Sequence, residues 1–249
     1  MLLRVLPWAV PLGLLAAWQL ASATGALPAL VLPAPSAVLS AAAKLTRSGE
    51  LPANLLVSAL RAFAGLLIGG GLGFLLGLAN GVSRWSEALT DSSLQMVRNI
   101  PHLALIPLVI LWFGIGETAK VFLVALGCFF PIYVNTLHGV RGVDPKLVEM
   151  ARVYGLRGGR LFRRVVLPGA LPAILVGLRY ALGVMWLTLI VAETIAATTG
   201  VGHMAMQARD FLQVDVVVLA ILIYAALGKL ADVGVRAWER RLPGAPARA

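Results

Sequence analysis

Six stretches of predominantly apolar residues, each near the length of a membrane span, constrain the fold of this chain more than any other feature. They cover residues 5–24, 62–83, 99–114, 118–137, 171–197 and 214–235, and residues 94–97 can extend the short third stretch. An apolar helix needs about twenty residues to cross a bilayer. Only 13% of the residues are charged, against about one quarter in soluble proteins. The sequence therefore predicts an all-α integral membrane protein with about six transmembrane helices.

The basic residues between these stretches indicate the orientation. If the N-terminus lies inside, 14 of the 21 Lys and Arg residues fall in cytoplasmic segments, as the positive-inside rule requires. We therefore expect both termini in the cytoplasm. The same distribution accounts for the net charge of +10, so membrane lipid is an expected partner and nucleic acid is not.

The first 60 residues allow two interpretations. Residues 5–24 form either a retained span or a cleaved signal peptide, because Ala21-Ser22-Ala23 resembles a cleavage site. Outside the membrane we expect surface helices over residues 37–45, with Ser36 as N-cap, and over 51–60. The predicted division of the chain is an N-terminal span with a periplasmic connecting segment (1–54), a membrane core (55–238) with a cytoplasmic loop at about 139–170, and a basic cytoplasmic tail (239–249).

The second stretch carries a ladder of glycines at every fourth position: Gly65, Gly69, Gly73, Gly77 and Gly81. Residues four apart lie on the same helix face, and a face of small residues lets a neighbouring helix approach closely. The ladder predicts tight helix packing. A flat face of this kind would also let two helices slide past each other when the protein changes state.

Prolines are expected to break several stretches. Pro101 and Pro107 lie in the third, Pro131 lies in the fourth, and Pro168 and Pro172 flank the entry to the fifth. A proline removes a helix hydrogen bond and kinks the helix. Kinked helices are typical of membrane proteins that contain a polar path, so we expect the third stretch to contribute to one.

Few charged residues lie inside the stretches. Arg179 and Glu193 in the fifth are too far apart to pair within one helix. Lys229 and Asp232 in the sixth are three residues apart and are expected to pair. A carboxylate at membrane depth needs a partner or water, so for Glu193 we expect a role in gating, in a subunit contact or in direct substrate contact.

The sequence contains no enzyme motif. It lacks the Gly-x-x-x-x-Gly-Lys-Ser/Thr phosphate loop, so we expect no ATP hydrolysis by this chain alone. His102, His138 and His203 are isolated, and the single Cys128 lies in an apolar run. We therefore expect no metal site, no disulfide and no catalytic or cofactor-binding residues.

A charged segment between the fourth and fifth stretches is the part expected to meet a soluble partner. Asp144 is suited to cap a helix that begins at Pro145, and Gly155 is suited to end it. The pattern i, i+3, i+4, i+7 predicts an apolar ridge on this helix, formed by Leu147, Met150, Ala151 and Tyr154. A short basic helix over residues 160–166 should follow. The ridge fits a groove on a partner protein, and the alternative is a helix that lies on lipid.

This loop resembles the EAA loop in the permeases of ATP-binding-cassette (ABC) importers. That pattern reads Glu-Ala-Ala, three residues, Gly, nine residues, then Ile-x-Leu-Pro. Here the matching residues, with the spacing kept, are Glu149-Met150-Ala151, Gly155 and Val165-x-Leu167-Pro168. The chain departs from the pattern at Met150 and Val165, where one apolar residue replaces another.

Further segments resemble the nitrate, taurine and sulfonate branch of these permeases, over residues 98–108, 111–114, 130–133 and 187–194. From about Leu32 to Arg241 the chain is most similar to the aliphatic-sulfonate permeases of that branch. The resemblance implies the type I ABC importer permease fold, and a multi-pass protein of the bacterial inner membrane that is a transport subunit rather than an enzyme.

The resemblance also implies partners. Family members form a permease homodimer with two copies of a cytoplasmic ABC ATPase, and a periplasmic or lipid-anchored binding protein delivers the substrate. No cofactor is expected on this chain, because the partner ATPase uses ATP and Mg²⁺. The residues implied to couple the chain to the ATPase are Glu149, Met150, Ala151, Tyr154, Gly155, Val165, Leu167 and Pro168.

The implied function is ATP-driven import of aliphatic sulfonates by alternating access. A sulfonate needs hydrogen-bond donors and positive potential. Candidates along the translocation path are Arg98, Asn99, His102 and Thr188, together with Glu193. Thr188 is equally suited to bond its own helix backbone, and Arg98 to anchor the inner interface. Alternatives are a permease for taurine, nitrate or a thiamine precursor and, more remotely, a membrane scaffold or sensor that does not transport.

Overall fold

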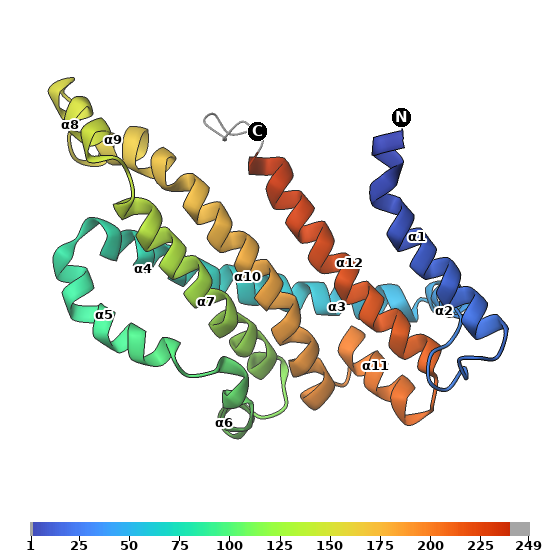
Figure 1. Ribbon diagram of the computed structural model, residues 1–249. Helices are drawn as coiled ribbons and strands as arrows, with labels where there is room; N and C mark the ends of the chain where they lie inside the picture. Colours follow the sequence, from blue (N-terminus) through green and yellow to red (C-terminus); the bar gives the residue numbers. More distant parts are fainter. Residues whose placement is uncertain (1, 240–249) are drawn as a thin grey trace. The chain divides into compact units, whose positions relative to one another are not determined.

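All regular secondary structure in the described part of the chain is helical (Figure 1). The computed structural model describes residues 2–239, without the side chains of residues 2–8 and 196. No strand occurs among these residues, which confirms the predicted all-α class. Beyond Glu239, the predicted basic tail lies outside the described residues.

In chain order the elements are α1 (Leu2–Ala23), α2 (Pro35–Arg47), α3 (Glu50–Gly65), the π turn η1 (Leu66–Gly70), α4 (Gly71–Val82), α5 (Arg84–Arg98), the 3-10 turn η2 (His102–Leu105), α6 (Ile106–Phe113), α7 (Glu117–Arg141), α8 (Pro145–Val153), α9 (Gly158–Leu161), the π turn η3 (Phe162–Val166), α10 (Leu167–Ala196), α11 (Val201–Asp210) and α12 (Val214–Glu239).

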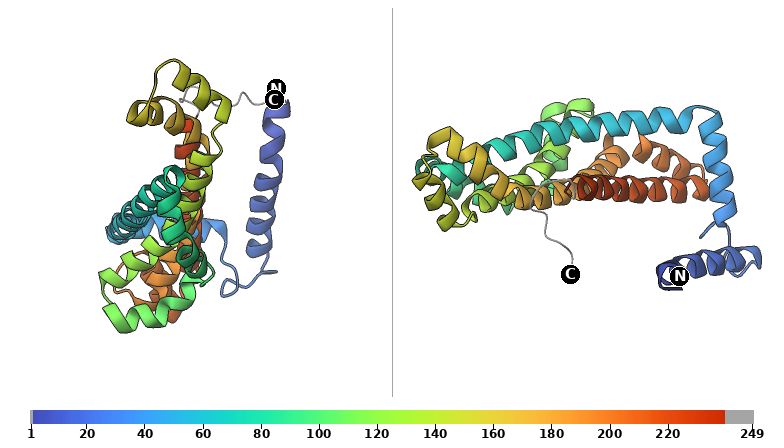
Figure 2. Two further views of the ribbon diagram at one scale, coloured as in Figure 1. Left: turned by 90° about the vertical axis from the view of Figure 1, so that its left-hand side faces the viewer. Right: turned by 90° about the horizontal axis from the view of Figure 1, so that it is seen from above.

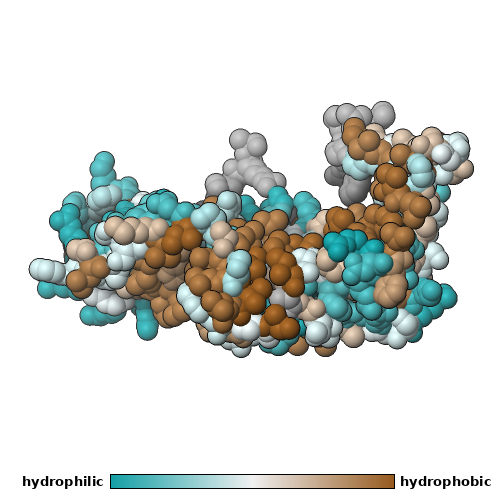
Figure 3. All heavy atoms as spheres, turned by 90° about the horizontal axis from the view of Figure 1, so that it is seen from below, coloured by the Kyte–Doolittle hydropathy of each residue, from teal (hydrophilic) through white to brown (hydrophobic). Residues whose placement is uncertain are grey.

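Among the described residues, four helices are long and apolar enough to cross a membrane: Glu50–Val82, Glu117–Arg141, Gly158–Ile195 and Val214–Glu239. A fifth candidate is the bent pair of α5 with η2 and α6. The predicted first span is represented by the shorter apolar helix Ala9–Ala23. Many large apolar side chains of these helices are exposed, as contact with lipid requires, and Figure 3 shows such apolar surface in brown.

The second span is longer than predicted. α3, η1 and α4 form one continuous helix of 33 residues, visible as a single rod in Figure 2. The helix predicted over residues 51–60 is present, but it is the first part of this rod and not a separate element. Ser58 in this part of the rod and the neighbouring Arg61 are buried and bonded within the protein. Pro52 does not end the helix because it lies in the first turn, where its missing N–H costs nothing.

The glycine ladder of this rod lies against α7. A Cβ added at Gly69 would overlap the backbone carbonyl of Ala125, and one added at Gly77 would lie 2.8 Å from the carbonyl oxygen of Tyr133. Gly73 meets the carbonyl oxygen of Phe129, while Gly65 and Gly81 meet the side chains of Val124 and Val140, all on α7. Side chains of any size would push the two helices apart, so the rod and α7 pack nearly backbone to backbone.

The third span is interrupted where its prolines predict. The axes of α5 and of the helical segment His102–Phe113 differ by 80°. Asn99 ends α5, and Pro101 follows; a proline lacks the N–H that would continue the helix and disfavours helical geometry at the residue before it. Pro131, in contrast, lies inside α7 without breaking it.

The fifth span begins earlier than predicted. α9, η3 and α10 form one continuous helix over Gly158–Ile195, so the separate basic helix predicted over 160–166 is wrong. Pro168 follows directly after the π turn η3, and Pro172 lies inside α10. A π turn widens the helix, and the change of hydrogen-bond register next to Pro168 lets the helix continue past a ring that would otherwise clash with the preceding turn.

Two local predictions are also wrong. α2 begins at Pro35 with Ala34 as N-cap, because the amide N–H and hydroxyl of Ser36 are both bonded to the side chain of Gln19. Asp232 does not pair with the exposed Lys229.

The carboxylate of Asp232 instead contacts Arg236 and lies 3.6 Å from Nε of Arg179 on α10. Arg179 also pairs with Glu239. A guanidinium offers several donors in a planar fork, so one α10 cation holds two carboxylates of α12.

Packing divides the described chain into two units. The first holds the chain up to Ala59 with Glu193–Ala226, and the second holds Leu60–Ala192 with the chain from Leu227 onward. The boundary at residue 54 expected from the sequence stays a prediction. The second unit contains an apolar cluster around the break in the third span, formed by Ile106, Val109, Ala119, Leu123 and Ala192.

Candidate functional site

The ends of α8 are built by the residues that the sequence singled out. Oδ1 of Asp144 accepts a hydrogen bond of 2.8 Å from the N–H of Lys146. At the other end Gly155 has φ +81°, in the left-handed region that favours glycine. The N–H of Leu156 then reaches back to the carbonyl of Ala151 at 3.0 Å, a pattern that closes a helix end. Both helix boundaries predicted here are present.

An exposed apolar ridge runs along α8 and the residue after it. The exposed fractions are 49% for Leu147, 53% for Met150, 86% for Val153 and 80% for Tyr154. Ala151, which the sequence pattern placed on the same ridge, is only 5% exposed and packs into the protein. Val153 belongs to the exposed set and was missed because its spacing did not fit the i, i+3, i+4, i+7 pattern. We call Leu147, Met150, Val153 and Tyr154 the α8 ridge.

The remaining residues of the EAA-like pattern lie around this ridge. Glu149 is exposed on α8, Val165 and Leu167 are half-buried, and Pro168 is exposed. Figure 1 shows α8 and α9 at the same end of α7 and α10. The pattern is therefore spread over a short exposed helix and the first turns of a long one.

Two of the predicted path residues line one cavity. Arg98 and His102 border a space of about 700 Å³ together with residues of α7 and α10, which we call the central cavity. Nε2 of His102 lies 2.9 Å from Oγ1 of the fully buried Thr188. Asn135 and Tyr180 add polar groups to a wall that is otherwise apolar. Sequence reasoning missed these two residues, because only the fold brings α7 and α10 next to the break between α5 and η2 in the third span.

The other two predicted path residues lie elsewhere. Asn99 is the exposed C-cap of α5 and does not line the central cavity. Glu193 is 1% exposed and belongs to the first unit. Its carboxylate accepts hydrogen bonds from the Ser58 hydroxyl at 2.8 Å and from the Gly202 N–H and the Tyr224 hydroxyl, both at 2.9 Å. These donors come from α3, α11 and α12, so Glu193 joins four helices of one unit.

Two further polar clusters were not predicted. Near the start of α7, Glu117 accepts from Nη2 of Arg61 at 2.6 Å and from Nζ of Lys120 at 3.0 Å. Both cations are buried, whereas the carboxylate is 61% exposed. A lone Arg at the edge of a span is the signal that could have indicated this cluster, since it needs a partner at that depth.

The second cluster surrounds the buried Asn80 at the end of α4. Its Nδ2 donates to the Tyr133 hydroxyl at 2.9 Å and to Oγ1 of Thr90 at 2.7 Å. Arg141 donates to the Asn80 carbonyl at 3.0 Å and pairs with Glu87. An Asn within an apolar, glycine-rich run was the available signal. Among the described residues, no group of three or more His, Cys, Asp or Glu is placed to hold a metal ion.

Comparison with known proteins gives one family. Residues 69–243 match the family described as binding-protein-dependent transport system inner membrane component. The chain is 62% identical to a relative from Escherichia coli (strain K12) named "Putative aliphatic sulfonates transport permease protein SsuC", over 96% of this chain and 91% of the relative. A relative of the same name from Bacillus subtilis (strain 168) is 47% identical over 94% and 84%.

A taurine transport system permease protein of Escherichia coli (strain K12) is 41% identical over 78% of this chain and 69% of that protein. Among solved structures, an amino acid ABC transporter chain superposes with a TM-score of 0.65 at 20% identity, over 80% of this chain and 97% of that chain. A chain of the MetNI methionine ABC transporter superposes with a TM-score of 0.53 at 21% identity, over 74% and 92%. These superpositions show that the fold is that of ABC transporter permeases.

Proposed function

Because the chain belongs to the family of binding-protein-dependent transport system inner membrane components, we propose that it is the permease subunit of an ATP-driven importer of aliphatic sulfonates. The observation that carries the proposal is the 62% identity to the Escherichia coli relative over 96% of this chain. A second relative with the same printed function, at 47% identity, supports the same substrate class.

The α8 ridge is the proposed contact with the ATPase. Four large apolar side chains in water are costly for a subunit that remains alone, and a short amphipathic helix fits a groove on a partner. Glu149, Met150, Tyr154 and Gly155 would meet the ATPase directly. The other residues of the pattern would not contact the ATPase but would hold α8 and the following helix in position: Ala151, Val165, Leu167 and Pro168. ATP and Mg²⁺ would be held by the ATPase, and this chain would respond to its closure.

The proposed assembly contains two copies of this chain, two ATPase subunits and one periplasmic or lipid-anchored binding protein. The family description names a binding protein and the inner membrane. The basic loop around α8 faces the cytoplasm in this arrangement, and both termini lie on that side, as the distribution of Lys and Arg favours. Closure of the ATPase pair would draw the two α8 helices together and rock the helix bundles between inward-open and outward-open states.

The central cavity is the proposed part of the translocation path. An aliphatic sulfonate has an anionic head and an apolar chain. Arg98, His102 and Asn135 offer positive potential and hydrogen-bond donors for the head, while the apolar wall suits the chain. Thr188 would act through His102, whose ring it holds. Asn99 would act at the entrance, since it lies beside Arg98 without lining the cavity.

For Glu193 we propose a structural role that keeps α10 bound to α3, α11 and α12. Its carboxylate accepts from Ser58, Gly202 and Tyr224 within the protein, and its 1% exposure argues against direct contact with an anion. The glycine ladder is proposed to hold the rod against α7 while the bundle rocks.

A second candidate substrate is taurine, because the taurine permease relative is 41% identical to this chain. Taurine carries an ammonium group next to its sulfonate, and the apolar wall of the central cavity would desolvate that charge without a carboxylate to pair it. The central cavity therefore suits alkanesulfonates better than taurine.

Uptake of a labelled alkanesulfonate tests the proposal. Cells that lack their own sulfonate permease would express this chain with its cognate ATPase and binding protein. Unlabelled alkanesulfonate, taurine and nitrate would serve as competitors. We expect uptake that is blocked by alkanesulfonate and only weakly by the other two. Membrane-inserted protein without sulfonate uptake, in the presence of both partners, would overturn the substrate assignment.

A further inference from the structure

A second large cavity lies behind α8, on the side away from the ridge. It has a volume of about 960 Å³ and is bordered by the ends of α4 and α7, by α8 and by the start of the helix α9–η3–α10. Its residues are unrelated to the central cavity, and no step of the proposed function uses it. We call it the interface cavity.

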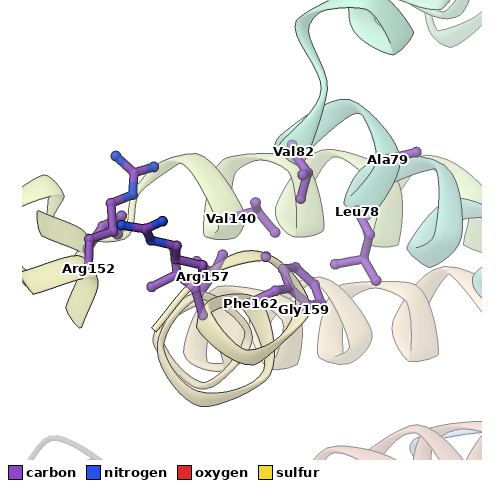
Figure 4. Close-up of a pocket in the computed structure, with 13 residues that line it drawn as sticks. Leu78, Ala79, Val82, Val140, Arg152, Arg157, Gly159 and Phe162 are labelled. Carbon is purple, nitrogen blue, oxygen red and sulfur yellow. The ribbon is translucent and has the colours of Figure 1, made fainter. Parts of the chain in front are cut away.

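The walls of the interface cavity are apolar. Leu78 and Val82 of α4, Val140 of α7 and Phe162 of η3 all line it (Figure 4). Such walls make favourable van der Waals contact with a hydrocarbon chain. A small hydrated ion is disfavoured there because it would lose its water without gaining a polar partner.

The rim of the cavity is basic. Arg152 and Arg157 line it, and Figure 4 shows both guanidinium groups to the same side of the apolar residues. An adjoining cavity of about 710 Å³ shares Gly81 and Val82 with it and adds Arg84 and Arg141. Of the residues that line the two cavities, the one carboxylate is Glu87, which already pairs with Arg141. The rim therefore keeps an excess of positive charge.

The cavity also lies where candidate membrane spans end. Two candidate spans end at its border, one at Val82 and one at Arg141. The level at which apolar span residues give way to arginines is where the phosphates of a bilayer lie.

From these three features we propose that the interface cavity binds one anionic phospholipid of the surrounding membrane. An acyl chain would occupy the apolar part, and the headgroup phosphate would bind Arg152 and Arg157, with Arg84 near enough to add to the potential. Arginine is suited to this because its planar fork binds phosphate oxygens in pairs. A neutral or zwitterionic lipid would leave the excess charge of the rim without a counter-ion.

The bound lipid would touch the helix that carries the α8 ridge, because Val148 and Arg152 of α8 line the cavity. The lipid would then set the position of α8, so the anionic lipid content of the membrane would influence how well the ATPase is coupled. The binding itself does not depend on which substrate is transported, so failure of the sulfonate assignment would leave this proposal standing.

Native mass spectrometry of the full-length chain tests the proposal. The delipidated protein in detergent would be titrated with phosphatidylglycerol and with phosphatidylcholine of the same acyl chains, and with inorganic phosphate as the probe for a headgroup alone. We expect phosphatidylglycerol adducts at concentrations about thirtyfold below those needed for phosphatidylcholine, since each basic residue contributes about 1 kcal/mol to binding of an anionic lipid. Equal binding of the two lipids, or binding of phosphate alone, would overturn it.

Two variants distinguish lipid binding in the interface cavity from lipid binding elsewhere on the protein surface. Arg152→Gln with Arg157→Gln should raise the phosphatidylglycerol concentration needed by about thirtyfold. Gly159→Leu should exclude the acyl chain, because Gly159 lines the cavity and an added Cβ there meets no atom within 4 Å. Matched controls are Arg47→Gln with Arg209→Gln, and Gly183→Leu, which also meets no atom. Unchanged phosphatidylglycerol binding in both cavity variants would contradict the proposal.

Discussion

Nε2 of His102 lies 2.9 Å from Oγ1 of Thr188, and this contact ties the break in the third span to α10. The two residues are far apart in the chain, and each belongs to an element that lines or borders the central cavity. Because Thr188 is fully buried, its hydroxyl has no water to replace the imidazole. The contact therefore fixes the position of the broken segment relative to α10.

Replacing Thr188 by Val should destabilise the protein by about 1–3 kcal/mol, because the half-buried imidazole of His102 loses its hydrogen bond to the Thr188 hydroxyl. Thr188→Ser keeps the hydroxyl and should cost less. Thermal unfolding of the purified variants in detergent measures the difference. If Val and Ser variants unfold at the same temperature, the hydrogen bond does not hold the break.

Gly69→Ala should weaken the packing of the rod on α7. The added methyl group would overlap the backbone carbonyl of Ala125, and a backbone cannot move aside as a side chain can; overpacking of this kind costs about 1–3 kcal/mol. Gly71→Ala is the matched control, since its Cβ meets no atom within 4 Å. We expect Gly71→Ala to be neutral or slightly stabilising. Equal stability of the two variants would contradict close packing at the ladder.

Tyr224→Phe should lower stability by about 1.5–3 kcal/mol, because it removes one hydrogen bond to the buried carboxylate of Glu193 and leaves the rest of the cluster. Tyr180→Phe removes the hydroxyl of an exposed tyrosine and should change stability by less than about 0.5 kcal/mol. Denaturation midpoints of both variants give the comparison. A Tyr224→Phe variant as stable as wild type would show that the Glu193 cluster does not hold the helices.

Gly155→Val should impair coupling while the protein still inserts. The φ of +81° at this residue costs a β-branched residue about 1–2 kcal/mol or more, so the turn after α8 would rearrange. Asn tolerates the left-handed region far better, and Gly155→Asn should retain more activity. Uptake per inserted molecule is the quantity to compare. Equal uptake by the two variants would contradict the prediction, because coupling would then not depend on the geometry of this turn.

Local chemistry was enough to predict the parts of the chain that depend on neighbours in sequence. Asp144, Pro145 and Gly155 bound α8 through their own backbone and side-chain preferences. Four-residue spacing alone placed the glycine ladder on one face. Pro101 marked the break because proline acts on the residue before it and on its own hydrogen bond.

Contacts between helices could not be predicted in this way. Asp232 was assigned to Lys229 by spacing along one helix, yet the cation that reaches it from another helix is Arg179. The donors to Glu193 come from three other helices. Ser58, in the helix expected at the outer surface, is bonded to Glu193, and the neighbouring Arg61 is bonded to Glu117. Only the tertiary structure decides which polar groups meet.

On the proposed function, ATP hydrolysis by a partner ATPase drives sulfonate import through this chain by way of the α8 ridge. The most direct measurement is accumulation of labelled alkanesulfonate in proteoliposomes that contain this chain with its ATPase and binding protein. Wild type would be compared with Met150→Asp, which places a charge in the exposed ridge without disturbing buried Ala151. We predict ATP-dependent accumulation by wild type and its loss in Met150→Asp with the complex still inserted. Accumulation that is independent of ATP, or unchanged in Met150→Asp, would contradict the account.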